Sequence, residues 1–150
     1  MIKRGGAGLK FDNDFFNTEV REGFEISSMM KRAWAAQMEV FQVVSDICNR
    51  NGIRYFADFG TLLGAVRHKG MIPWDDDIDI SLMRDEYNEL IRILPGELPY
   101  GFVVAGMYAD CERLQNAAFV PQLRVIADEE LWNFNDYMLS LIHISEPTRP

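Results

Sequence analysis

Apolar side chains in two stretches of the chain recur at intervals of three and four residues, the period of an amphipathic helix. The first stretch begins after a cap at Ser27 or Ser28 and ends at Asn51-Gly52. It is interpreted as a plain core helix that faces a sheet and needs no cofactor. The second stretch runs from Arg84 to Leu94, where Pro95-Gly96 interrupts the pattern and predicts the end of the helix.

Shorter apolar runs predict the strands. A short helix from Leu62 to Val66, capped by Thr61 and ended at Gly70, is predicted between the first two strands. Pro121 places the last strand at a sheet edge or a bulge. The order of elements predicts an α/β (α+β) fold, a mixed sheet with helices mainly on one face. The predicted strands are Arg54–Phe59, the stretch around Asp77–Ile80, Phe102–Met107 and Phe119–Ala127.

Composition narrows the class of protein. The 150 residues are 48% apolar and 25% charged, so at most one soluble globular domain is expected. A net charge of −8 argues against nucleic acid as a partner. Two cysteines, Cys48 and Cys111, make no disulfide framework, which favours a reducing compartment. No apolar run approaches the ~20 residues of a transmembrane helix and no secretion signal is found, which predicts a cytoplasmic location, with the inner face of the membrane left open.

Four carboxylates within five residues are the strongest chemical feature: Asp75, Asp76, Asp77 and Asp79. Ile78 and Ile80 alternate with the last acids and require an extended, partly buried strand. Unpaired carboxylates are costly to bury, so the cluster needs cations, and oxygen-only ligands suit Mg²⁺ or Mn²⁺. Asp77 and Asp79 share one face of the strand and are predicted to hold the metal, with Asp75 and Asp76 as outer-shell or substrate-orienting groups. A solvated acidic loop is the alternative.

The segment upstream of the acids is predicted to bind phosphate. Gly60-Thr61 combines a residue that lets a ligand approach the backbone with the free N–H groups of a helix start, which favour an anion. Arg67 would offer a bidentate fork to phosphate and Lys69 a point charge. His68 is either a phosphate contact or a structural hydrogen-bonding residue. Trp74 either stacks on a base or sugar or lines the mouth of the site.

The run from Gly60 to Ile80, GTLLGAVRHKGMIPWDDDIDI, resembles the signature of the LicD family, which includes the fukutin-type phosphotransferases. It is a variant of the Gly-[Gly/Ser]…Asp-x-Asp pattern of the polymerase-β-like nucleotidyltransferase fold, with Thr61 in the second position. The similarity extends from about Phe11 to Tyr137. It implies metal-dependent transfer of a phospho-substituent, such as phosphocholine or an alditol phosphate, from a CDP-linked donor. The implied acceptor is a cell-surface glycan of the lipopolysaccharide or teichoic acid kind, or its lipid-linked precursor.

Three segments are expected along the chain: a flexible leader and draping segment (1–24), a partial LicD catalytic domain (25–138) and a non-native tail (139–150). The tail sequence LSLIHISEPTR resembles the translation of a sequencing adapter and is left out of the fold prediction. LicD-type proteins continue into a strand with an Asp-Ile-Phe-Pro-Leu-Asp run, and in this fold a third carboxylate from a later strand completes the metal site. The resemblance therefore implies an enzyme as the full gene product and an inactive fragment in these 150 residues.

Two other functions stay open at this point. One is nucleotidyl transfer of the polymerase-β type, in which NMP moves to a small hydroxyl compound and pyrophosphate leaves. The other is a non-catalytic acidic module that binds Ca²⁺ or a basic partner. The leaving group distinguishes the two transfer reactions: a CDP-linked donor releases CMP, whereas nucleotidyl transfer releases pyrophosphate. Metal binding that is the same with and without nucleotide would indicate the binding module. Nothing in the sequence specifies an oligomeric state.

Overall fold

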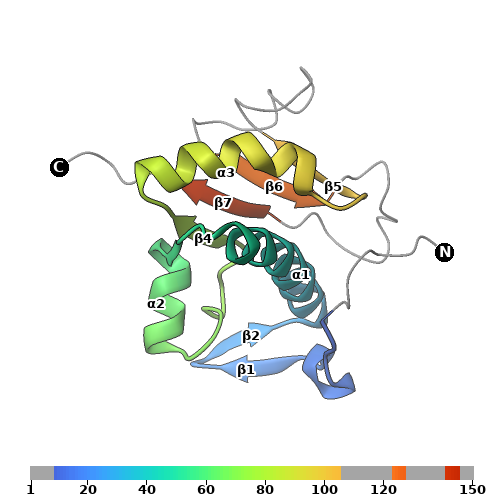
Figure 1. Ribbon diagram of the computed structural model, residues 1–150. Helices are drawn as coiled ribbons and strands as arrows, with labels where there is room; N and C mark the ends of the chain where they lie inside the picture. Colours follow the sequence, from blue (N-terminus) through green and yellow to red (C-terminus); the bar gives the residue numbers. More distant parts are fainter. Residues whose placement is uncertain (1–8, 106–122, 128–140, 146–150) are drawn as a thin grey trace.

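The computed structural model describes residues 9–105, 123–127 and 141–145, which form a five-stranded sheet, three α-helices, one 3-10 turn and a small hairpin (Figure 1). The strand order of the sheet is β3-β4-β7-β6-β5. β4 and β7 pair in parallel and every other pair is antiparallel, so the predicted mixed sheet is confirmed. The strands are β3 (Phe56–Ala57), β4 (Ile78–Ser81), β5 (Phe102–Ala105), β6 (Leu123–Ala127) and β7 (Leu141–Ser145).

The long predicted helix is α1 (Ser28–Asn51), and both of its ends lie where the sequence placed them. The Ser27 hydroxyl accepts a backbone N–H of the first turn, from Met30, at 3.2 Å. Gly52 follows the last residue with a φ of 67°, the left-handed conformation that favours glycine. The apolar stripe predicted for this helix is buried at Trp34, Val44 and Cys48.

The second predicted helix is α3 (Arg84–Glu97), which extends beyond the stop expected at Pro95-Gly96. That prediction of the helix end was wrong. Pro95 lies near the C-terminus of the helix, where it removes only one backbone donor, its own N–H. The helical bonding continues past it, since the Leu98 N–H bonds the Leu94 carbonyl at 3.0 Å. Tyr87, Leu90 and Leu94 are buried on one face, as their spacing indicated.

One hydrophobic core joins β4 to both long helices. Ile78 and Ile80 of β4 are buried in the same cluster as Val44 of α1 and Leu90 of α3. Alternate residues of a strand point to the same face, so α1 and α3 cover one face of the sheet, as predicted. Asp79 lies between the two isoleucines and therefore points to the opposite face.

The N-terminal part forms structure that the hydrophobic pattern did not predict. After the 3-10 turn η1 (Asn13–Phe16), strands β1 (Glu19–Arg21) and β2 (Phe24–Ile26) make an antiparallel hairpin that lies beside α1 in Figure 1. Glu22 and Gly23 turn the chain with φ values of 52° and 79°. Lys31 of α1, almost fully buried, places its ammonium 2.9 Å from Glu19, and this hydrogen bond lowers the pKa of the Glu19 carboxyl.

The sheet also contains one strand more than the sequence pattern predicted. β7 belongs to the tail that the fold prediction left out, and it lies between β4 and β6 with Asp79 and His143 in register. The adapter origin of the tail stays a prediction. The end of the strand predicted at Phe102–Met107, the start of the one at Phe119–Ala127 and Cys111 lie outside the described residues. Among the helices of the described ranges, none combines the length and hydropathy needed to cross a bilayer.

Candidate active site

The connection from β3 into α2 (Phe59–Arg67) is built around Asp58. Its carboxylate caps the helix by accepting the Phe59 N–H at 2.9 Å, and it also accepts the hydroxyl hydrogen of Ser81. Phe59 has a φ of 41°, which non-glycine residues rarely adopt. The cap predicted at Thr61 was wrong because the helix begins at Phe59, three residues before the predicted start at Leu62. Asp58 is a site residue that the sequence analysis missed, although aspartate is among the strongest capping residues.

Gly60 and Thr61 connect the start of α2 to the acidic segment. Thr61 Oγ1 accepts the backbone N–H of Asp79 at 2.7 Å, which ties the helix to β4. A Cβ at Gly60 would overlap the Asp75 carboxylate, so the close approach of that carboxylate requires glycine here. An acidic side chain thus lies beside the backbone that was predicted to bind phosphate, and phosphate binding by Gly60-Thr61 stays a prediction.

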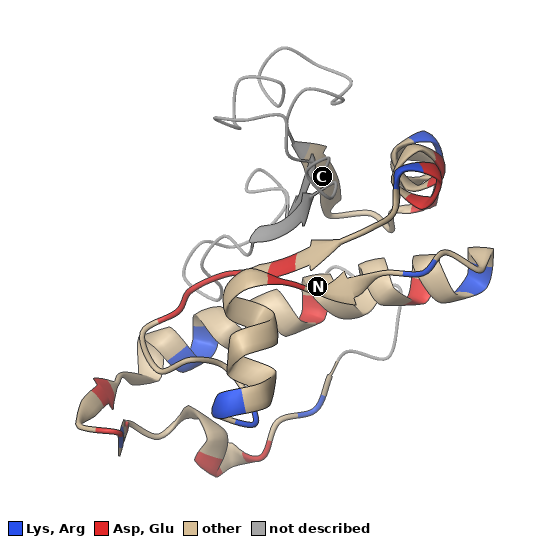
Figure 2. Cartoon of the chain, turned by 90° about the vertical axis from the view of Figure 1, so that its left-hand side faces the viewer, with Lys and Arg blue, Asp and Glu red and all other residues tan. Residues whose placement is uncertain are grey.

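Asp75, Asp76 and Asp77 come directly before β4 and Asp79 lies within it, and Figure 2 colours the acidic residues of the chain red. Asp75, Asp76 and Asp77 each offer one carboxylate oxygen, and these oxygens lie within 4.8 Å of one another. β4 begins at Ile78, so Asp77 belongs to the preceding loop and strand alternation does not govern it. Asp75, Asp76 and Asp77 form a compact triplet in the loop and Asp79 lies on the strand, and these four residues are here called the acidic cluster. The assignment of Asp77 and Asp79 as the metal pair, with Asp75 and Asp76 outside it, stays a prediction.

Electrostatic coupling joins Asp79 to the rest of the acidic cluster. Burial, and then the negative charges of Asp77, Asp75 and Asp58, raise the pKa of Asp79 to about 6. Burial first and the charge of Asp77 next raise the pKa of Asp75. Carboxylates that resist ionising together are stabilised by a cation, and a donor set made only of oxygens fits the predicted Mg²⁺ or Mn²⁺.

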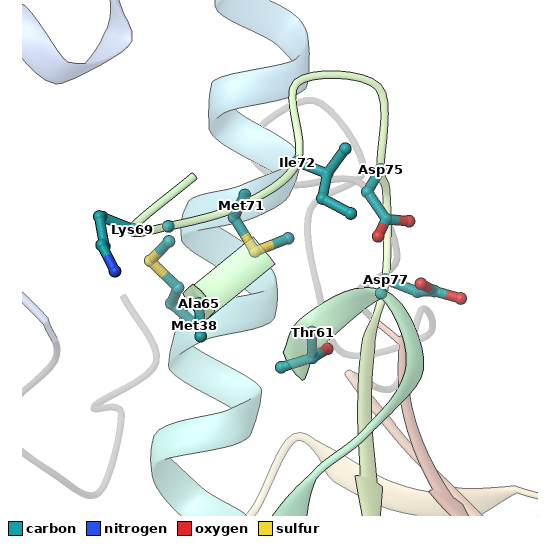
Figure 3. A pocket seen from close by; sticks show the side chains of 10 residues that line it. Met38, Thr61, Ala65, Lys69, Met71, Ile72, Asp75 and Asp77 are labelled. Carbon is teal, nitrogen blue, oxygen red and sulfur yellow. The ribbon is translucent and has the colours of Figure 1, made fainter. Parts of the chain in front are cut away.

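A cavity of about 410 Å³ opens beside the acidic cluster (Figure 3). Thr61, Asp75 and Asp77 lie on one side of it, and Lys69 lies on the other side, beyond Met38. Such a cavity combines a group of carboxylates, one ammonium and an apolar floor, which suits a ligand that carries both phosphate and apolar parts. The complete lining is Met38, Gly60, Thr61, Ala65, Lys69, Gly70, Met71, Ile72, Asp75 and Asp77.

The three basic residues after α2 have different environments. Arg67 is exposed in the last turn of the helix and is not among the residues that line the cavity. Lys69 lines the cavity and donates from Nζ to the Val66 carbonyl at 2.9 Å. The His68 side chain is only 1% exposed, with Nδ1 3.2 Å from a Glu22 carboxylate oxygen. His68 is also the C-cap of α2, so the helix end predicted at Gly70 was wrong, and a structural role for this histidine is favoured.

Trp74 lies between the hairpin and the end of α2. Its ring makes edge contacts with Phe24, at 6.0 Å between centroids, and with His68, at 6.1 Å. Because 54% of Trp74 remains exposed, its position allows either of the two predicted roles, stacking on a ligand or lining the mouth of the site.

Comparison with known proteins gives a consistent group of relatives. The family profile described as LicD/FKTN/FKRP, nucleotidyltransferase domain, matches residues 52–138, more than half of the chain. The lipopolysaccharide cholinephosphotransferase LicD of Haemophilus influenzae is 53% identical over 47 residues, which are 31% of this chain and 18% of that protein. The human ribitol 5-phosphate transferase FKRP is 37% identical over 51 residues, 34% of this chain and 10% of that protein. An uncharacterized protein of Rickettsia prowazekii is 41% identical over 71 residues, 45% and 27% of the two chains.

Proposed function

Because the chain belongs to the LicD/FKTN/FKRP nucleotidyltransferase-domain family, we propose that it serves the metal-dependent transfer of a phospho-substituent from a CDP-linked donor to a glycan hydroxyl. The two named relatives are a cholinephosphotransferase and a ribitol 5-phosphate transferase. Both names describe the movement of a phosphorylated alcohol, so phosphocholine or an alditol phosphate is the proposed group. The segments that align with this chain cover only 27%, 18% and 10% of these three relatives. The transfer activity of a whole protein is therefore proposed for this chain and is not shown by the comparison.

The observation that carries the proposal is the acidic cluster beside Gly60 at the cavity. Several carboxylates converge at one point, and burial together with the neighbouring negative charges raises the pKa of Asp79 to about 6. A donor phosphate is also negative and cannot approach such a cluster without a cation. A divalent cation satisfies both groups, and glycine at position 60 leaves room for the Asp75 carboxylate against the backbone.

Each group in the site has a role in this proposal. Asp75, Asp77 and Asp79 would hold Mg²⁺ or Mn²⁺, which supplies charge neutralisation for phosphate oxygens when bound. Lys69 lies across the cavity and would contact the same phosphate as a point charge. Asp58, through its bonds to Phe59 and Ser81, fixes the start of α2 relative to β4. Because phosphoryl transfer depends mainly on positioning and charge neutralisation, these roles account for the catalysis proposed.

Titration calorimetry of the purified chain tests the proposal. CDP-choline and CDP-ribitol are each titrated with Mg²⁺ present or with EDTA, and CMP release is followed in parallel. We expect binding with Mg²⁺ that is lost with EDTA, and at least tenfold weaker binding in Asp77→Asn. Asp46→Asn, an exposed aspartate on α1, is the matched control and should bind like the original chain. Equal binding with Mg²⁺ and with EDTA would contradict the proposal.

Nucleotidyl transfer is the second candidate, favoured by the nucleotidyltransferase description of the family. The same acidic cluster would then serve an NTP donor, and pyrophosphate rather than CMP would leave. Incubation with the four NTPs and a coupled pyrophosphate assay separates the two reactions. Cation binding that is identical with and without nucleotide would instead indicate a non-catalytic acidic module.

A further inference from the structure

Two side chains of α1 hold the backbone of the loop that carries the acidic cluster. The indole N–H of Trp34 donates to the carbonyl of Asp75 at 2.8 Å. The side-chain amide of Gln37 donates to the carbonyl of Asp76. Trp34 and Gln37 are each only 2% exposed and lie three residues apart, so they project from the same side of the helix.

These two bonds act at the point where the loop departs from strand geometry. In an extended chain successive side chains point to opposite sides, so three consecutive aspartates could not converge. Here the carboxylate oxygens of Asp75, Asp76 and Asp77 lie within 4.8 Å of one another. The chain turns just before them, with the Asp75 N–H bonded to the Ile72 carbonyl at 3.0 Å, and runs without regular structure from Asp75 to the start of β4 at Ile78. Like charges at this separation repel, so the turned path needs bonds that hold it from outside the loop.

The environment of Gln37 indicates that the role of its side-chain amide is to bond the loop. The Nε2 group reaches the Asp76 carbonyl, whereas the Oε1 atom is buried without a hydrogen-bond partner among the described residues. Burying an amide oxygen without a partner is costly, and an apolar side chain of similar length would fill the same space without that cost. The donated bond is therefore the feature that an apolar residue would not reproduce.

We propose that Trp34 and Gln37 are positioning residues that hold the Asp75 and Asp76 carbonyls and thereby make the carboxylates of the acidic cluster converge on a divalent cation. The cation part of this inference rests on the proposed function, whereas the restraint of the loop does not. α1 thus has a second task besides its core face: its N-terminal half restrains the site loop, while Val44 and Ile47 pack in the core.

Two variants remove the donors and keep an aromatic ring or an unbranched side chain in place. Trp34→Phe retains an aromatic ring without the N–H, and Gln37→Met retains the length without the amide. Val44→Ala is the control, because it is fully buried in α1 and lies about 15 Å along the helix from Trp34. Amide hydrogen exchange at Asp75 and Asp76 is measured by NMR, and Mn²⁺ affinity is measured by titration calorimetry without nucleotide. Thermal unfolding of each variant reports overall stability.

Each donor variant is expected to speed amide exchange at Asp75 and Asp76 about fivefold, the effect of one lost hydrogen bond, and to weaken Mn²⁺ binding by a similar factor. Val44→Ala should lower the unfolding temperature and leave both loop readouts unchanged. Unchanged exchange in both donor variants, or an equal effect in Val44→Ala, would overturn the inference. If the original chain binds no Mn²⁺, the proposed metal function and the cation part of the inference both fail. The exchange rates then still decide whether the two side chains restrain the loop.

Discussion

The charge on Asp79 should make the folded chain less stable as the pH rises toward neutrality. The pKa of this carboxyl is about 6 in the folded state, against an ordinary value of 3.8. Between these two values the folded state binds more protons than the unfolded state, so the free energy of unfolding falls as pH rises through that window. Above pH 6 Asp79 is ionised in both states, and the full loss in free energy of unfolding is present. Asp79→Asn removes the charge and should remove this part of the pH dependence.

The size of the effect follows from the shift in pKa. About two pH units correspond to at most about 3 kcal/mol, at 1.36 kcal/mol per unit. Asp79 is only partly buried, so screening by water reduces this upper limit. We expect the Asp79 charge to lower the free energy of unfolding by about 1–2 kcal/mol. At pH 7 without divalent cations, Asp79→Asn should therefore be more stable than the original chain by about 1–2 kcal/mol. At pH 4 the two proteins should differ by only a few tenths of a kcal/mol, since the carboxyl is then protonated in the folded state.

Urea unfolding followed by tryptophan fluorescence measures this difference at half-unit steps from pH 4 to 7.5, in EDTA. Taking the difference between the two proteins cancels the carboxyls that are not coupled to Asp79, such as Glu19 and Glu97, whose lowered pKa values contribute stability that is lost on acidification. Repeating the series with Mg²⁺ should raise the stability of the original chain at pH 7 and leave Asp79→Asn nearly unchanged. A difference that is flat across the pH range, or an Asp79→Asn variant that is less stable at pH 7, would refute the reasoning.

Three further outcomes are expected. Gly64→Ala should destabilise the chain by about 1–3 kcal/mol in urea unfolding, because its Cβ would lie 2.5 Å from the Gly70 carbonyl oxygen. Gly70→Ala, whose Cβ would meet nothing within 4 Å, should change the free energy by less than about 0.5 kcal/mol, and equal losses would contradict the structure. Thr61→Val removes the acceptor of the Asp79 N–H and should cost about 1–2 kcal/mol in the same assay, whereas Thr61→Ser should cost less. Burial raises the pKa of the Cys48 thiol to about 11, so mass spectrometry should find its peptide unmodified by iodoacetamide at pH 7.5 until urea unfolds the chain. Rapid labelling of the folded protein would contradict this.

The parts of the fold that were predictable are those in which several sequence signals agree. For α1, an apolar stripe, a serine cap and a terminal glycine all indicate the same boundaries, and the structure has them. The hairpin strands β1 and β2 have only three residues each, which is too short for a two-residue period to be recognised. The end of α3 was misjudged because a proline near the C-terminus of a helix costs only one backbone donor.

The acidic cluster was predictable in composition and only partly in geometry. The sequence predicted a site formed by Gly60 and the run of aspartates, and Gly60, Asp75 and Asp77 all line one cavity. The division of the aspartates into pairs assumed that the strand already included Asp77, whereas β4 begins at Ile78. Trp34 looked like an ordinary core residue, because a bond to a carbonyl 41 positions away in the sequence leaves no local pattern.

The contact between Asp75 and Gly60 has a consequence for the order in which ligands arrive. The carboxylate lies against the backbone where a donor phosphate is expected, so free inorganic phosphate meets a negative charge at that spot. A divalent ion that draws Asp75 toward itself would clear the approach, and we therefore expect the cation to enter before the nucleotide. Such a sequence of events would keep abundant small anions from occupying the site while no ion is bound.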